Sequence, residues 1–107
     1  MVQGILIPAS DAAPPELRSF ETLEQYQDAV GGWIEAVDVP DREVTLFVNE
    51  EGLVLGLPFN RRATYFWWHF VPHVASRARL VGDVVLVGWP NQHGDSTDGI
   101  AARIGDI

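Results

Sequence analysis

The sequence predicts a single α+β domain in which two helices pack on one side of a mostly antiparallel sheet of four to five strands. Three observations predict it: residues alternating with period two from Trp33 onward, a capping box at Thr22, and a continuous apolar run from Val84 to Trp89. The 107 residues suffice for one domain. We expect its core over about 2–89 and a polar tail over about 90–107.

The N-terminal part predicts one strand and one helix. Residues 3–9 form a short apolar strand ended by Pro8, and the small residues and prolines of 10–15 predict a loop. Thr22 and Gln25 have the spacing of a capping box, so a helix is expected to begin directly after Thr22. Its apolar residues recur at helical spacing, and Gly31 supplies a left-handed stop.

The middle of the chain predicts a meander of three strands. Residues 33–39 alternate with period two, and 44–49 are rich in β-branched and aromatic residues. Asn49-Glu50-Glu51-Gly52 predicts a tight hairpin turn in which Gly52 takes a positive φ. Residues 53–57 then return as a third strand, ended by Pro58.

A second helix and a buried strand follow. Asn60 suits the N-cap of a helix over 61–71, which Pro72 ends. This helix has one broad apolar face for packing. After a Gly82-Asp83 corner, residues 84–89 form an apolar run that is typical of a central strand.

Composition narrows the classes of function. The chain has no cysteine, which excludes disulfides and thiolate metal sites. The formal net charge is −8; residues 1–52 hold eleven of the fifteen acidic residues and two of the seven arginines, so they carry −9 and the rest carries +1. Such a charge disfavours nucleic acid and anionic membranes as partners. With no signal-like start and no apolar run long enough for a membrane span, we expect a cytoplasmic protein.

Histidines are the main candidates for metal-binding or catalytic residues. His69 and His73 have the spacing of two metal ligands on one helical face, and His93 with Asp95 or Asp98 could add ligands from the tail. Because spacing fixes no third ligand, we predict no metal, no cofactor and no catalytic residue. The alternative is a small-molecule or metal-dependent enzyme that uses His69, His73, His93 and Asp95.

Nucleic-acid binding is a second alternative. The aromatic run 65–70 could stack on bases, with a phosphate track of Arg61, Arg62, Arg77 and Arg79. Most of these rings lie on the face that the helix has to bury, so core packing is favoured. Tyr65 and Trp68 fall off the apolar stripe and are interpreted as a contact with a partner or a second copy.

Acidic residues gather on the predicted strands and turns. They are Glu35, Asp38, Asp41, Glu43, Glu50 and Glu51. The group is interpreted either as a solvated face or as a surface that imitates the phosphates of a nucleic acid toward a basic partner.

Four motifs together carry a resemblance. They are GGWIEAV at 31–37, FVNEEGLVLGLPFNRRAT at 47–64 with the Trp67-Trp68 pair, GDVVLVG at 82–88, and Gly-Asp-Ser-Thr-Asp at 94–98. In this combination the chain resembles domain of unknown function 3846, small proteins met in bacterial genomes and often in phages and plasmids. The resemblance supports the fold and carries over no activity, ligand or catalytic residue. We therefore expect a non-enzymatic accessory protein that acts through contacts with an unknown protein or with itself.

Overall fold

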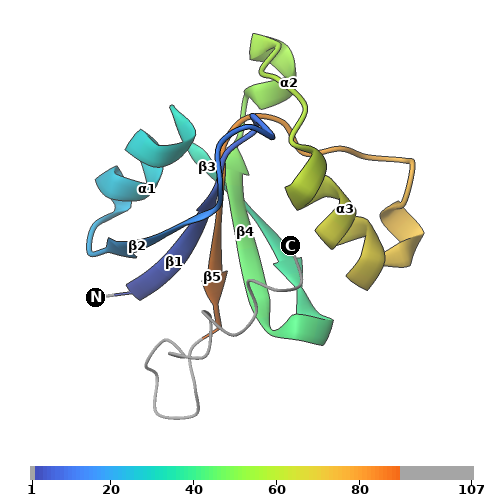
Figure 1. Ribbon diagram of the computed structural model, residues 1–107, viewed down its shortest axis with the longest axis horizontal. Coiled ribbons are helices and arrows are strands. Elements are labelled where there is room, and N and C mark those ends of the chain that lie inside the picture. The colour runs from blue at the N-terminus through green and yellow to red at the C-terminus, as the bar shows by residue number, and fades with distance from the viewer. Residues whose placement is uncertain (1, 90–107) are drawn as a thin grey trace.

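A five-stranded antiparallel sheet with helices on both of its faces forms the protein in a computed structural model that describes residues 2–89 (Figure 1). The strands lie in the order β2-β1-β5-β4-β3. Their bounds are β1 Val2–Ile7, β2 Glu16–Phe20, β3 Ile34–Val39, β4 Val44–Asn49 and β5 Val84–Gly88. The α+β class with a mostly antiparallel sheet is confirmed, and β5 takes the central place that its apolar run predicts.

Helix α1 (Leu23–Val30) begins and ends where the sequence predicts. Thr22 is the N-cap: its hydroxyl accepts a hydrogen bond from the backbone N–H of Gln25, and the Gln25 side chain accepts one from the backbone N–H of Thr22. Gly31 closes the helix in the left-handed conformation, with φ of 80°. The capping box therefore fixes the point at which the chain leaves β2 and enters α1.

Strands β3 and β4 form a hairpin joined by the 3₁₀ turn η1 (Pro40–Arg42). In the register of this hairpin, Val39 lies opposite Val44 and Ile34 lies opposite Asn49. Strand β4 pairs on its other side with β5, whereas β3 is one edge of the sheet.

The predicted third strand of the meander is wrong. Residues after Asn49 form the short helix α2 (Gly52–Leu55), and the hairpin turn with a positive φ at Gly52 is absent. The left-handed glycine of this segment is Gly56, with φ of 69°, which caps α2. The five residues 53–57 are too few for their periodicity to distinguish a strand from a helical turn. Here α2 begins at Gly52 and is capped by Gly56, so the segment is helical.

Helix α3 (Arg61–Phe70) confirms the second predicted helix and its N-cap. The Asn60 side chain accepts a hydrogen bond from the backbone N–H of Ala63. Ala63 and Phe66 are buried against the sheet, and Trp67 and Phe70 pack at the margin of the same core. The 3₁₀ turn η2 (Pro72–Val74) follows directly after the helix.

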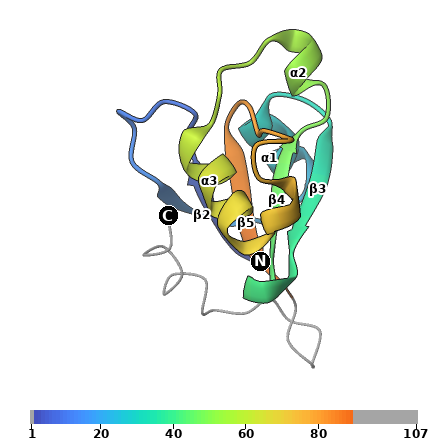
Figure 2. The same cartoon turned by 90° about the vertical axis from the view of Figure 1, so that its right-hand side faces the viewer.

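The two main helices lie on opposite faces of the sheet, which corrects the prediction of one-sided packing (Figures 1 and 2). On the α3 face, Ile5, Ile7 and Leu86 belong to the larger core cluster. On the α1 face, Leu6, Val85 and Val87 belong to a second cluster. Successive residues of β1 and β5 are thus buried on alternate faces, which requires a cover on each side.

Strand β2 was not predicted from the sequence. Of its five residues only Phe20 is buried, and the other four are exposed on an edge of the sheet. The predictions for the tail, including His93, Asp95 and the Gly-Asp-Ser-Thr-Asp motif, lie outside the described residues.

Candidate interaction surface

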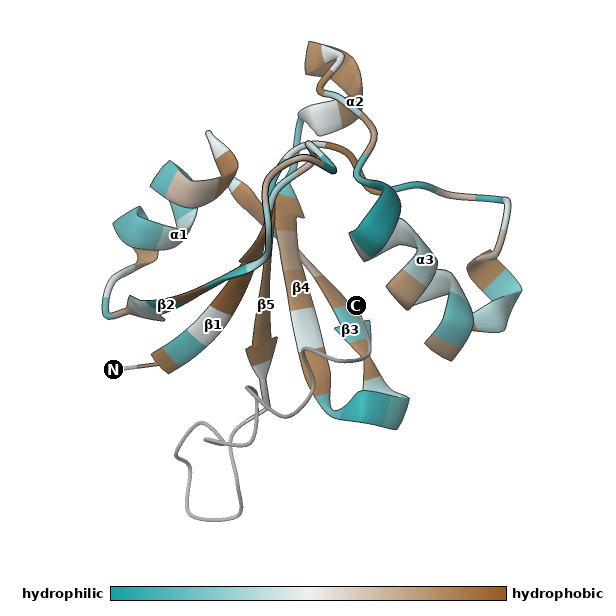
Figure 3. Ribbon diagram, in the orientation of Figure 1, coloured by the Kyte–Doolittle hydropathy of each residue, from teal (hydrophilic) through white to brown (hydrophobic). Residues whose placement is uncertain are grey.

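Helix α2 projects beyond one end of the sheet and carries exposed apolar side chains (Figure 3). Leu53, Val54 and Leu55 are 62%, 86% and 57% exposed. We call these three residues the apolar tip. Single exposed apolar side chains are common on protein surfaces, whereas three consecutive ones on a projecting turn are typical of a contact surface.

The apolar tip is held out from the domain by glycines. A Cβ at Gly52 would lie 2.8 Å from Val81 Cγ2, so the start of α2 packs too closely for any side chain. The backbone N–H of Leu57 donates to the carbonyl of Gly52, and Gly56 adopts a left-handed conformation between them. These contacts turn the chain back toward α3 and leave the three apolar side chains outside.

Asn49 links the segment that precedes the apolar tip to the end of α1 through hydrogen bonds. Its side chain is buried, donates to the carbonyl of Val30 and accepts from the backbone N–H of Glu51. The backbone N–H of Glu50 donates to the carbonyl of Trp33, and the Trp33 side chain is 65% exposed. The exposed indole therefore lies at the same end of the sheet as the tip.

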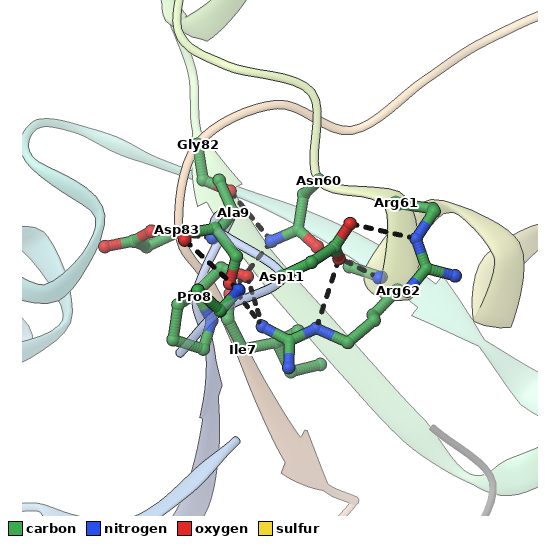
Figure 4. A network of polar contacts seen from close by, with 12 residues as sticks. Ile7, Pro8, Ala9, Asp11, Asn60, Arg61, Arg62, Gly82 and Asp83 are labelled. Atoms are coloured by element: carbon green, nitrogen blue, oxygen red, sulfur yellow. Dashed lines mark hydrogen bonds and ion pairs between the residues drawn. The ribbon is translucent and has the colours of Figure 1, made fainter. Parts of the chain in front are cut away.

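Asn60 fastens the other side of this end (Figure 4). Its side chain is fully buried and donates to the carbonyls of Ile7 at 2.8 Å and Gly82 at 2.9 Å. The carbonyl oxygen of the same amide caps α3 through Ala63. One side chain thus joins β1, the corner before β5 and the start of α3.

Two arginines attach the loop between β1 and β2 to α3 (Figure 4). Arg62 donates to the carbonyls of Pro8 and Ser10, and Arg61 donates to Asp11 at 3.1 Å. This hydrogen bond to Asp11 raises the pKa of Arg61. Both guanidinium groups are therefore engaged within the protein. Of the predicted phosphate track, Arg62 is half-buried, whereas Arg61, Arg77 and Arg79 are exposed.

The predicted acidic group is divided between two ends of the β3–β4 hairpin. Asp41 and Glu43 lie at η1, whereas Glu50 and Glu51 follow β4 at the base of the tip. Six strand residues separate the two ends, which corresponds to about 20 Å. On the edge strand itself, Glu35 is exposed, and Asp38 accepts a hydrogen bond from Thr45 at 2.7 Å.

The two off-stripe aromatic residues of α3 lie together. Tyr65 is 49% exposed, and its ring centroid lies 5.5 Å from that of Trp68 and 6.3 Å from that of Phe59. Trp68 is half-buried, and its indole N–H donates to the carbonyl of Ala78 at 2.7 Å. Tyr65 is therefore the more accessible of the two predicted contact residues.

The histidines within the described residues form no metal centre. His69 and His73 are exposed, and no group of three or more His, Asp, Glu or Cys side chains that could hold a metal ion occurs in residues 2–89. The ring of His69 packs edge-on against Phe70 with centroids 4.6 Å apart. The structure thus places His69 beside an apolar neighbour at the end of α3.

Fold and surface together define the class of protein: a small α+β domain with a five-stranded antiparallel sheet and a projecting apolar turn. A family model for a domain of unknown function, DUF3846, matches residues 2–105, so the chain belongs to that family. No curated protein and no solved structure matches the chain. Among the described residues, no helix has the length and apolar character that crossing a membrane requires.

Several motifs that carry the family resemblance meet at the end of the sheet that bears the tip. Gly32 approaches the Asn49 amide so closely that a Cβ would lie 3.0 Å from Nδ2. The backbone N–H of Gly82 donates to the carbonyl of Pro58 at 2.7 Å. The local signals at these residues indicate separate turns and caps. They do not predict that the residues share one end of the fold, because the contacts between them are long-range.

Proposed function

We propose that this protein is a non-enzymatic, cytoplasmic accessory protein of the kind carried by phages and plasmids, and that it binds another protein through the apolar tip and the adjacent Glu50 and Glu51. The exposure of the tip is the observation that carries the proposal. Full burial of a valine or leucine side chain favours association by about 1.5–3 kcal/mol. Three such side chains contribute about 4.5–9 kcal/mol, against an association cost of about 4–15 kcal/mol, so the tip is proposed as the anchor of an interface that includes further contacts.

The charges around the tip indicate what the partner presents. Glu50 and Glu51 are exposed beside it, and the whole chain carries a net charge of −8. A partner with an apolar pocket and a basic rim is complementary to this surface. A two-fold contact between copies would place the tip glutamates of both copies close together, so like charges oppose self-association.

The first experiment is a pull-down in which wild type and each variant are immobilised and incubated with lysate of a host bacterium. The variant Val54→Asp places a charge in the tip, and Leu17→Asp places the same charge on the exposed β2 edge as a matched control. We expect a partner that is retained by wild type and Leu17→Asp and is lost with Val54→Asp. The partner is then purified, and its affinity for each variant is measured by calorimetry.

A charge-reversal pair tests the acidic part. We expect Glu50→Arg with Glu51→Arg to weaken partner binding at least about tenfold, by analogy with close charge pairs at other interfaces. The same reversal at Asp41 and Glu43, at the far end of the hairpin, serves as the control. Equal retention of the purified partner by wild type and Val54→Asp would exclude the tip as its binding surface.

A further inference from the structure

A second concave surface lies on the α1 face, away from the apolar tip. It is a pocket of about 480 Å³ lined by residues of β1, β2, α1, β3, β4 and β5. Helix α1 has eight residues and so covers about 12 Å, whereas six-residue strands extend about 20 Å. The pocket arises because the helix is shorter than the sheet that it covers, and its volume lies in the range of small-molecule sites.

Aromatic side chains dominate the walls of this pocket. Phe20 and Tyr26 stack with ring centroids 4.5 Å apart, and Phe47 meets Tyr26 edge-on at 5.1 Å. Trp89 lines the pocket from the end of β5. Phe20 itself is 3% exposed, so the accessible rings of this cavity are those of Tyr26, Phe47 and Trp89, which offer π-surface to a planar ligand or a cation.

The polar groups at the floor are fixed within the protein. The indole N–H of Trp89 donates to the Thr45 hydroxyl at 3.0 Å, and this hydroxyl donates to Asp38 at 2.7 Å. This chain of hydrogen bonds holds the Trp89 ring in one orientation. Burial also raises the pKa of the Tyr26 hydroxyl, which favours its neutral form.

The charge of the pocket is negative. Glu21 is the one charged side chain among the described lining residues, and no arginine or histidine of residues 2–89 lines the pocket. Asp38 lies beside the lining residue Thr45, directly opposite it on the neighbouring strand β3. An anionic ligand would therefore meet repulsion from these carboxylates and from the net charge of the chain.

From this geometry we propose that the pocket on the α1 face binds a small planar aromatic molecule that carries a positive charge. The partly exposed rings of Tyr26, Phe47 and Trp89 supply stacking and cation–π contacts. Glu21 and Asp38 supply the electrostatic preference. The site is independent of the apolar tip, so it adds a ligand-binding role to the proposed partner contact.

Four probes of similar size test the two parts of the proposal on the full-length protein. They are 2-naphthylmethylammonium, neutral 2-naphthylmethanol, anionic 2-naphthoate, and decahydro-2-naphthylmethylammonium, which keeps the charge and the carbon skeleton without the aromatic rings. Titrations followed by two-dimensional NMR give an affinity for each probe and the residues whose signals shift. We expect naphthylmethylammonium to shift the pocket residues and to bind about fivefold more tightly than the alcohol, since a unit-charge interaction at contact range in water is near 1 kcal/mol.

The anion is expected to bind most weakly of the naphthyl probes, and the saturated decahydronaphthyl cation about threefold to tenfold more weakly than its aromatic analogue. Naphthoate binding as tightly as the naphthyl cation would overturn the charge preference. Equal binding of the two cations would overturn the aromatic preference. Signal shifts that fall outside the pocket would overturn the site itself.

A matched pair of surface variants separates this pocket from the tip. Leu23 lies at the rim of the pocket and is 55% exposed, whereas Leu53 of the tip is 62% exposed. We expect Leu23→Arg to weaken binding of the naphthyl cation about fivefold, by repulsion at the rim, and Leu53→Arg to leave it unchanged. A Leu23→Arg protein that binds the cation as wild type does would overturn the proposal, while partner binding through the tip would be unaffected by that result.

Discussion

Asn60 should be among the most costly residues to replace outside the apolar core. Its side chain is fully buried and makes three hydrogen bonds, donating to Ile7 and Gly82 and accepting from Ala63. In Asn60→Ala, the first turn of α3 loses its cap and the two carbonyls each lose a donor.

The cost follows from these contacts. Loss of an N-cap costs about 1 kcal/mol, and each further buried hydrogen bond contributes about 1 kcal/mol. We expect Asn60→Ala to lower the free energy of unfolding by about 3 kcal/mol. For a chain of this size, about 4 °C per kcal/mol converts that loss into a fall of about 12 °C in Tm.

Asn60→Asp keeps the cap and removes the donors, so it separates the two roles. Its carboxylate would face the carbonyls of Ile7 and Gly82 in a buried site, which raises its pKa in the folded state above the unfolded value of about 3.9. Stability contributed by the protonated acid is present below pH of about 4 and is lost as pH rises through the folded pKa. The variant should therefore differ least from wild type in acid.

Urea denaturation followed by far-ultraviolet circular dichroism, at several pH values from 4 to 8, measures both effects. Gln3→Ala, which removes an exposed amide from β1, is the control and should change stability by less than about 0.5 kcal/mol. A loss below about 1 kcal/mol in Asn60→Ala would refute the assignment of Asn60 as the link between β1, α3 and the β5 corner. A constant penalty for Asn60→Asp across this pH range would refute the account of its donors.

Three further outcomes are expected from measurements of stability. Gly82→Ala should cost about 2 kcal/mol, because φ is 75° there and a Cβ would lie 2.8 Å from Leu57 Cδ1; a neutral result would contradict this strain. Thr22→Ala should cost about 1 kcal/mol by removing the capping box with Gln25, which a thermal melt would detect. Burial raises the pKa of Tyr26, so stability should fall above pH of about 10 as the unfolded state ionises first, and Tyr26→Phe should reduce that fall.

Local signals allowed most helices and strands to be predicted from the sequence. The capping box at Thr22 and the N-cap at Asn60 depend on residues within one turn, and both are confirmed. Strand β2 could not be found this way, because an exposed edge strand such as Glu16–Phe20 has little apolar alternation. Its formation depends on pairing with β1, which is a long-range contact.

The one-sided packing was predicted wrongly although the sequence held a contrary signal. The run from Val84 to Gly88 is apolar at every position, and all five residues are buried. A strand covered on one face alone would alternate between apolar and polar residues. A continuous apolar central strand therefore indicates covers on both faces, which α1 and α3 supply.

Individual residues of the candidate surface could be predicted from the sequence, but the exposure of the apolar tip could not. The acidic residues and Tyr65 were identified from the sequence as contact residues, and that assignment stays a prediction. The exposure of Leu53 was not foreseen, since residues 53–57 had been assigned to a strand that would bury part of this run. Exposure depends on α2 leaving the sheet, which is set by the close contacts of Gly52.

The architecture restricts where this protein can make contact with another molecule. Both faces of the central strands are covered, and both edges carry exposed charged residues, Glu16 and Arg18 on β2 and Glu35 and Asp38 on β3. Charges of this kind oppose the addition of a foreign strand to an edge. Apart from the exposed side chains of Leu17, Trp33, Phe59 and Tyr65, accessible apolar surface in residues 2–89 lies where a helix is too short to cover the sheet or turns away from it. These conditions are met by the pocket beside α1 and by the tip on α2, so binding at one site leaves the other free.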